Sequence, residues 1–159
     1  MMDEDNCKGL LERVLQIKID HVEISREKSI VYLIGRSPPA EGMYYGMLGW
    51  VYHPEYKGVR LDVYAKDESQ TRYNVEMQVE KKPALGKRSR YYQSQMDMEM
   101  LLAGEDYAEL PNTYVIFICD FDPFGKGKYR YTFQTTCRES PKADLEDGRT
   151  IVFLNAHGK

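Results

Sequence analysis

The sequence predicts a layered α/β (α+β) domain in which a mixed sheet is flanked by helices. Residues 58–80 alternate polar and apolar side chains with a period of two, which is typical of two strands that each have one buried face. Residues 5–17 and 87–104 place apolar side chains at the spacing of a helical stripe. Residues 114–119 form a short, uninterrupted apolar run, typical of a strand buried on both faces. The predicted order is helix, three strands, helix, strand, and then two further strands.

The length of 159 residues predicts a single domain spanning residues 1–159. After the first helix, residues 21–32 are expected to form one strand or a broken hairpin. The consecutive prolines Pro38 and Pro39 mark a loop, because a proline pair does not fit a central strand. Residues 37–57 are interpreted as an insertion. Its aromatic side chains either form a local hydrophobic cluster or stack on exposed bases.

The two strands within residues 58–80 carry acidic side chains on their polar faces. Asp62 lies on the polar face of the first strand, and Glu76 and Gln78 lie side by side on that of the second. If the strands pair as a hairpin, one carboxylate from each converges on one point. Such a pair repels unless a cation lies between, and Mg²⁺ prefers oxygen ligands of this kind. The alternative is two unrelated acids on a solvated sheet face.

The second predicted helix, over residues 87–104, begins with two cations, Arg88 and Arg90. Cations are mildly unfavourable at a helix N-terminus, so their placement suggests that a phosphate approaches this end. The alternative is a solvated helix face. Gly104 is expected to end the helix. Further strands are predicted over residues 114–119, 129–135 and 150–155.

Composition is typical of a globular protein, with 30% charged and 42% hydrophobic residues. The net charge of −3 does not by itself favour nucleic acid, although basic residues cluster within 81–90 and 126–130. No run approaches the about 18 apolar residues of a membrane span. Three widely spaced cysteines argue against a disulfide framework. We therefore expect a cytoplasmic protein without a membrane partner.

Asp62, followed after the hairpin by Glu76-Met77-Gln78, resembles the PD-(D/E)XK nuclease superfamily, with Gln78 at the usual Lys position. The Arg- and Tyr-rich helix, the apolar strand ending in CDFD and the segment YRYTFQTTC extend the match. Over roughly residues 58–157 the chain is similar to the nuclease family found in transposases and recombination-promoting nucleases of mobile elements. The resemblance implies a restriction-endonuclease-like αβββαβ core with two extra C-terminal strands. It also implies that both termini are shorter than is usual in the family.

The same resemblance implies a Mg²⁺-dependent DNA endonuclease that hydrolyses phosphodiester bonds, with Mn²⁺ as a substitute. Asp62 and Glu76 then hold the metal, and the backbone carbonyl of Met77 completes the ligands. Glu12, on the first helix, is a further candidate ligand; the alternative is an exposed helix glutamate. Gln78 is the third catalytic candidate, but a neutral amide can position a water and cannot act as a base.

Arg88, Arg90 and Tyr92 are implied by the resemblance to contact DNA or to support the site. The alternative function is a catalytically inactive DNA-binding or assembly remnant of a mobile element. A third interpretation, a protein-interaction domain, rests only on the aromatic insertion.

Overall fold

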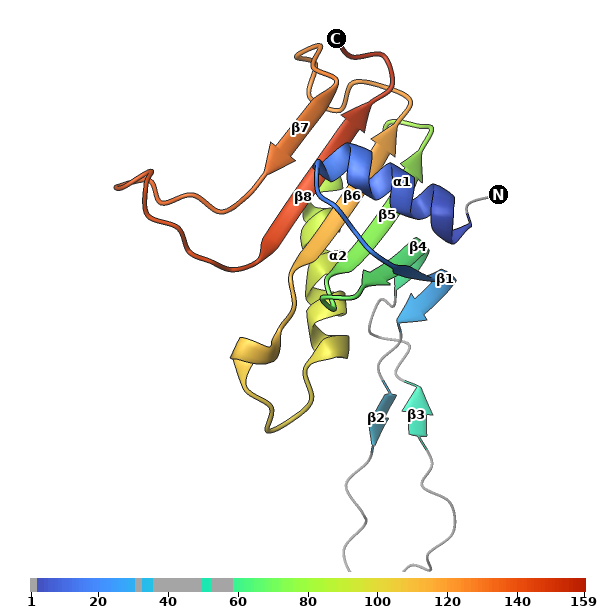
Figure 1. Ribbon diagram of the computed structural model, residues 1–159, viewed down its shortest axis with the longest axis vertical. Helices are drawn as coiled ribbons and strands as arrows, with labels where there is room; N and C mark the ends of the chain where they lie inside the picture. Colours follow the sequence, from blue (N-terminus) through green and yellow to red (C-terminus); the bar gives the residue numbers. More distant parts are fainter. Residues whose placement is uncertain (1–2, 31–32, 36–49, 53–58) are drawn as a thin grey trace, which may run out of the picture.

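The computed structural model describes residues 3–30, 33–35, 50–52 and 59–159, and Figure 1 shows how their elements are arranged. The predicted mixed sheet with flanking helices is confirmed, and the strands of this sheet follow the predicted order; two further short strands form a pair of their own. The elements are α1 (Glu4–Leu15), β1 (Val22–Ile30), β2 (Leu33–Gly35), β3 (Trp50–Tyr52), β4 (Val59–Asp67), β5 (Arg72–Gln78), α2 (Leu85–Met100), the 3₁₀ helix η1 (Tyr107–Glu109), β6 (Thr113–Cys119), β7 (Arg130–Phe133) and β8 (Arg149–Asn155).

Six strands form one mixed sheet in the order β1-β4-β5-β6-β8-β7. Strands β5, β6 and β8 run parallel to one another, whereas β1, β4 and β7 pair antiparallel to their neighbours. Because three neighbouring strands are parallel, their carboxyl ends and the segments that follow them lie at one edge of the sheet, at the top of Figure 1. We call this the carboxyl edge. Strands β2 and β3 form a separate antiparallel pair.

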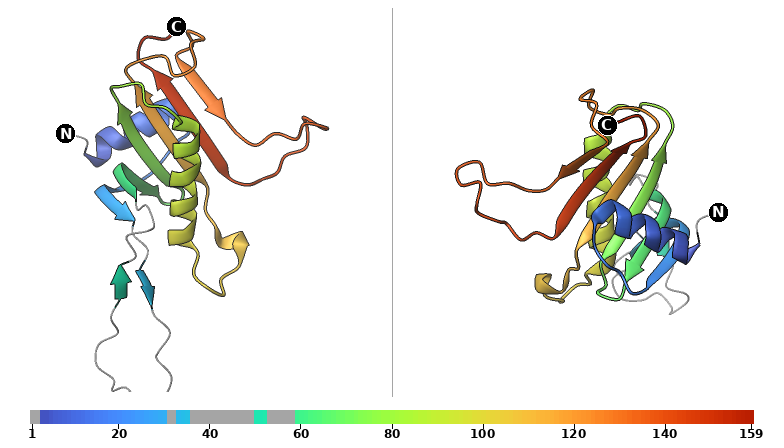
Figure 2. Two further views of the ribbon diagram at one scale, coloured as in Figure 1. Left: turned by 180° about the vertical axis from the view of Figure 1, so that it is seen from behind. Right: turned by 45° about the horizontal axis from the view of Figure 1, so that its top comes forward.

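The two helices cover opposite faces of the sheet (Figure 2). Leu11 and Val14 of α1 belong to one core, and Tyr92 and Met96 of α2 belong to the other. Alternate residues of β6 point into the two cores, as expected for a central strand. The α1 core also contains Ala65, Tyr73, Val75, Ile116, Val152 and Leu154, and the α2 core also contains Tyr64, Leu85, Val115, Phe117, Cys119 and Phe153.

Strand β5 differs from the predicted pattern of one buried and one solvated face. Its polar side chains are buried: Asn74 is 0% exposed, Glu76 1% and Gln78 6%. They lie on the face that α2 covers, whereas Met77, at a position expected to be apolar and buried, is 59% exposed. Period-two alternation reports which side chains share a face, but not whether a helix covers that face.

The second helix starts and stops earlier than predicted. It follows Ala84, which adopts the left-handed conformation with φ of 61°, and it ends at Met100. Leu101 is already extended, with φ of −118° and ψ of 117°. Gly104 therefore lies beyond the helix, in a turn that its φ of 94° suits.

Most of the expected insertion over residues 37–57 lies outside the described residues. Only Trp50–Tyr52 is described there, as strand β3. Both interpretations of its aromatic side chains stay predictions. In the part of the chain that the structure describes, neither helix has the length and apolar character needed to cross a membrane.

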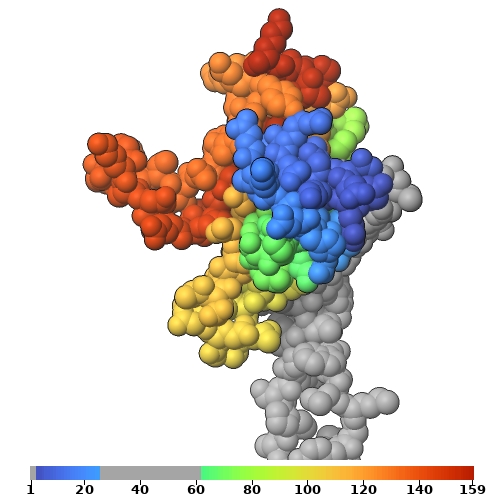
Figure 3. All heavy atoms as spheres, viewed as in Figure 1, coloured from blue at the N-terminus to red at the C-terminus, as the bar shows by residue number. Residues whose placement is uncertain are grey.

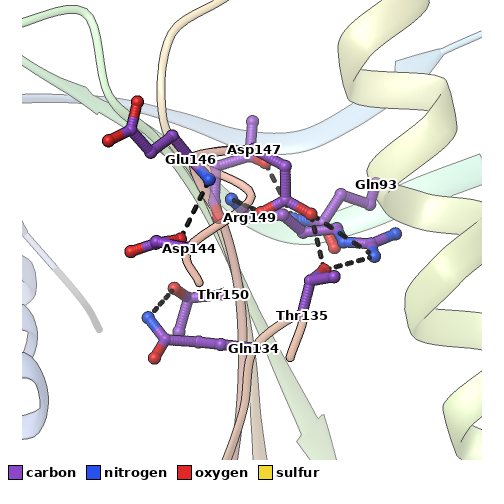
Figure 4. Close-up of polar contacts among 9 residues, drawn as sticks. Gln93, Gln134, Thr135, Asp144, Glu146, Asp147, Arg149 and Thr150 are labelled. Atoms are coloured by element: carbon purple, nitrogen blue, oxygen red, sulfur yellow. Dashed lines mark hydrogen bonds and ion pairs between the residues drawn. The ribbon is translucent and has the colours of Figure 1, made fainter. Parts of the chain in front are cut away.

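The loop between β7 and β8 lies at the edge of the sheet opposite the carboxyl edge. The Thr135 hydroxyl donates to Asp147 Oδ2 at 2.6 Å, and Arg149 Nη2 donates to Thr135 Oγ1 at 3.1 Å and pairs with Asp147 Oδ2 at 3.6 Å (Figure 4). A polar groove of about 470 Å³ lies beneath this loop. None of its lining residues belongs to the predicted catalytic set.

Candidate active site

The register of the β4–β5 hairpin brings Asp62 and Glu76 together. Val63 pairs with Val75, so one step further along both strands Asp62 lies beside Glu76. The backbone N–H of Asp62 donates to Glu76 Oε1 at 3.3 Å, and the backbone N–H of Met77 donates to Asp62 Oδ2 at 3.2 Å. Each carboxylate thus accepts a hydrogen bond from the backbone of the other strand.

The two carboxylates lie in different surroundings. Glu76 is 1% exposed, whereas Asp62 is exposed. Burial raises the pKa of Glu76, and the nearby negative charge of Asp62 raises it further; the backbone N–H of Asp62 and the guanidinium of Arg88 act in the opposite direction. Two carboxylates here face one guanidinium, and this excess of negative charge favours binding of a further cation.

Arg88, in the first turn of α2, spans the space between the helix and β5. Its Nη2 donates to Glu76 Oε2 at 3.1 Å, its Nη1 to Gln78 Oε1 at 3.2 Å, and its Nε to the Tyr92 hydroxyl at 2.6 Å. Its guanidinium also lies 5.0 Å from the centre of the Tyr92 ring. The sequence predicted that Arg88 contacts DNA or supports the site. In the structure three of its N–H donors bind acceptors of the protein itself.

Gln78 is held at both ends of its amide. Its Nε2 donates to the backbone carbonyl of Met77 at 2.9 Å, and its Oε1 accepts from Arg88. With 6% of its surface exposed, the side chain has little freedom to change rotamer. The amide is thus fixed beside Glu76 and the Met77 carbonyl.

The oxygen atoms gathered at this site are suitable ligands for a hard divalent cation. The candidate ligands are all oxygens: the carboxylates of Asp62 and Glu76 and the carbonyl of Met77. Each has lone pairs left after its hydrogen bonds, because a carboxylate offers about four acceptor positions and a carbonyl two. Within the described ranges, no group of three or more His, Cys, Asp or Glu side chains gathers to hold a metal. Water and substrate phosphate would therefore complete the coordination, as is usual for Mg²⁺.

Two predicted residues lie apart from this group. Glu12 is on α1, which covers the opposite face of the sheet, and its Oε1 accepts from the backbone N–H of Ile19 at 3.0 Å. The structure therefore does not bring Glu12 to Asp62 and Glu76; its carboxylate fastens the turn after α1. Arg90 is exposed on α2.

Sequence reasoning missed a polar pair at the neighbouring strand ends. His157 Nε2 lies 2.9 Å from Asp120 Oδ1, although the two residues are 37 positions apart in the sequence. The backbone N–H of Asp120 donates to the carbonyl of Gln78 at 2.9 Å. The pair could have been found from the topology alone. Asp120 follows β6 and His157 follows β8, and both strands run parallel to β5.

A mixed sheet with one helix on each face is the architecture of restriction-endonuclease-like nucleases. The family model described as PD-(D/E)XK nuclease family transposase matches residues 52–157. This is well over half of the chain, and the protein belongs to that family. The suspected resemblance is thereby confirmed, and it supports a nuclease or transposase type of function. Neither the curated proteins nor the solved structures gave a match.

Proposed function

We propose that the protein is a Mg²⁺-dependent DNA endonuclease, with Mn²⁺ as a substitute, that hydrolyses phosphodiester bonds at the carboxyl edge. One observation carries the proposal: the hairpin register brings the carboxylates of Asp62 and Glu76 together at the end of β5. Family membership supports a nuclease function and a nucleic-acid substrate, and nucleases of this superfamily typically use divalent metals. Membership of this nuclease family also fits a cytoplasmic location.

In this proposal Asp62, Glu76 and the carbonyl of Met77 hold the metal. When bound, a divalent ion supplies an acidified water and neutralises charge that develops on the scissile phosphate. Asp62 is exposed and can meet the ion from solvent, whereas Glu76 is fixed by two hydrogen bonds before any ion arrives. Such prior positioning lowers the cost of assembling the site.

Gln78 and Arg88 act together where the superfamily usually has a lysine. The amide of Gln78 orients water or phosphate oxygen but cannot take up a proton. The positive charge near this position comes from Arg88, whose guanidinium contacts both Glu76 and Gln78. A second cation at position 78 would lie beside that guanidinium, so the neutral amide suits its neighbour. Arg88 is therefore a positioning residue, supported by Tyr92.

A catalytically inactive DNA-binding or assembly remnant of a mobile element is the second candidate. The observation that favours it is the neutral Gln78, tied to Arg88 and the Met77 carbonyl rather than left open. The retained pair of Asp62 and Glu76 counts against it, because a protein that only binds DNA gains nothing from two adjacent carboxylates that repel phosphate.

Asp62→Asn and Glu76→Gln distinguish the two functions. Each removes one negative charge with little change in shape. For the endonuclease, each should lower nicking of supercoiled plasmid in Mg²⁺ or Mn²⁺ by about a hundredfold or more. DNA binding in EDTA should stay equal or tighten slightly, because a charge that repels phosphate is gone.

The matched control is Glu109→Gln, an exposed acid on η1, which should nick like the wild type. Nicking that persists in both site variants would contradict the assigned roles. Binding by the wild type without cleavage in any metal would favour the remnant.

A further inference from the structure

A second feature of the carboxyl edge is not used by the proposed chemistry. Two segments pack together at this edge, and we call them the basic lobe. The first is residues 120–129, which follow β6, and the second is residues 155–159, which begin with the last residue of β8. In the space-filling view these orange and dark red segments form the top of the molecule (Figure 3). Lys126, Lys128 and Lys159 are exposed on the lobe.

The first segment is built around the carboxylate of Asp122. It accepts hydrogen bonds from the backbone N–H groups of Phe124 at 3.0 Å, Gly125 at 2.9 Å and Gly127 at 2.6 Å, and from the Tyr131 hydroxyl at 2.9 Å. Gly125 and Gly127 have φ of 66° and 68°, which other residues rarely adopt. These hydrogen bonds hold the loop in a defined conformation. The Asp122 carboxylate is occupied by donors of the protein itself.

The second segment locks the first in place. The backbone N–H of Lys159 donates to the carbonyl of Gly127 at 2.9 Å, and the amide Nδ2 of Asn155 donates to the carbonyl of Lys128 at 3.2 Å. The packing at Gly158 is so close that a Cβ there would lie 2.4 Å from the carbonyl oxygen of Lys128. Two separate chain segments therefore hold the backbone that carries the lysines.

The basic lobe is also fastened to the candidate active site. The backbone N–H of Asp120 donates to the carbonyl of Gln78, and that of Ala156 donates to the carbonyl of Cys119, both at 2.9 Å. The remaining acid of the lobe, Asp120, pairs with His157. Asp122 is hydrogen-bonded within its own loop and Asp120 is exposed beside His157, so the three exposed lysines of the lobe outnumber its one exposed acid.

We propose that the basic lobe binds backbone phosphates of the DNA beside the scissile one, with Lys126 and Lys128 as the contacts. The inference rests on the proposed function for its choice of ligand. Phosphate is favoured because the exposed charges are ammonium groups, which bind phosphate as point charges without reading sequence. Because the loop is already ordered, little conformational entropy is lost on binding. The lobe would thus fix the position of the duplex relative to Asp62 and Glu76.

The test is the double variant Lys126→Ala/Lys128→Ala, titrated with a duplex in EDTA at several salt concentrations. Loss of two phosphate contacts should make the plot of log K against log salt less steep by about 2. It should also weaken binding at low salt by about 10- to 100-fold. Melting temperature should not change, because both side chains are exposed. The matched control is Lys142→Ala, in the β7–β8 loop at the opposite edge, which should bind DNA like the wild type.

Unchanged affinity and unchanged salt slope in the double variant would overturn the proposal. Failure here differs from failure of the proposed function. If the wild type nicks plasmid and the double variant binds DNA as the wild type does, the proposal that the basic lobe binds DNA is wrong, but the proposed endonuclease activity is retained. If the double variant binds weakly but the wild type never nicks, the lobe stands and the endonuclease is wrong.

Discussion

At the scale of single residues, the ion pair between Arg88 and Glu76 determines how the charge of the buried carboxylate is neutralised. Glu76 is an almost fully buried carboxylate, and a buried charge is tolerated only when it is paired and hydrogen-bonded. Arg88 provides that pairing and at the same time fixes Gln78 and contacts Tyr92. A divalent ion at Asp62 and Glu76 would share the task of neutralising Glu76 with Arg88.

Arg88→Gln should lower the free energy of unfolding by about 2–3 kcal/mol in EDTA, because Glu76 is left buried without its cation. Added Mn²⁺ should raise the melting temperature of this variant more than that of the wild type, since the ion then neutralises the carboxylates alone. Thermal unfolding with and without metal measures both effects.

Arg90→Gln is the control, because Arg90 is exposed on the same helix, and it should unfold like the wild type. An Arg88→Gln variant as stable as the wild type in EDTA would show that Glu76 does not depend on this ion pair.

At the scale of elements, the sequence specified most of the strands and helices but not what covers them. The period-two pattern placed Asp62, Glu76 and Gln78 on one face correctly, because alternation is a property of the strand itself. It could not show that α2 buries that face or that Arg88 reaches into it, since both depend on contacts between distant segments. Glu12 shows the same limit: the sequence offered it as a further candidate ligand, whereas its helix covers the other face and its carboxylate accepts from the backbone N–H of Ile19.

The loop after β6 depends on the ionised form of Asp122. Burial alone would raise the pKa of this carboxyl, but hydrogen bonds from Gly127, Phe124, Tyr131 and Gly125 outweigh it and lower the pKa to about 2. A lowered pKa contributes stability above the unfolded-state value, and this stability is lost as pH falls through the folded-state value.

Asp122→Ala should therefore be less stable than the wild type at neutral pH. The difference in unfolding free energy between the two proteins should shrink as the pH falls from about 4 to about 2. Urea unfolding across this range measures the difference, and comparison of the two proteins cancels the titration of other groups. A difference that does not vary with pH would mean that the carboxylate does not order the loop through its charge.

At the scale of the whole molecule, charge is arranged by topology rather than by composition. The net charge of −3 does not by itself favour nucleic acid, but the parallel strands bring the ends of three segments to one edge. The opposite edge carries an acidic loop, and local fields of this kind orient a charged ligand more than net charge does. The basic residues that follow the carboxyl edge include Lys81, Lys82, Lys126, Lys128 and Lys159, beside the acids Glu80 and Asp120, whereas the β7–β8 loop carries the acids Glu139, Asp144, Glu146 and Asp147, beside the cations Arg138 and Lys142.

The most direct measurement is anomalous X-ray scattering from crystals soaked in Mn²⁺. The proposed endonuclease requires a manganese peak in contact with the carboxylates of both Asp62 and Glu76, with the carbonyl of Met77 on the same ion. The peak should vanish after EDTA treatment and in crystals of Asp62→Asn. A soaked wild-type crystal without a peak there, or with manganese bound only elsewhere, would contradict the assignment of these residues as a metal site.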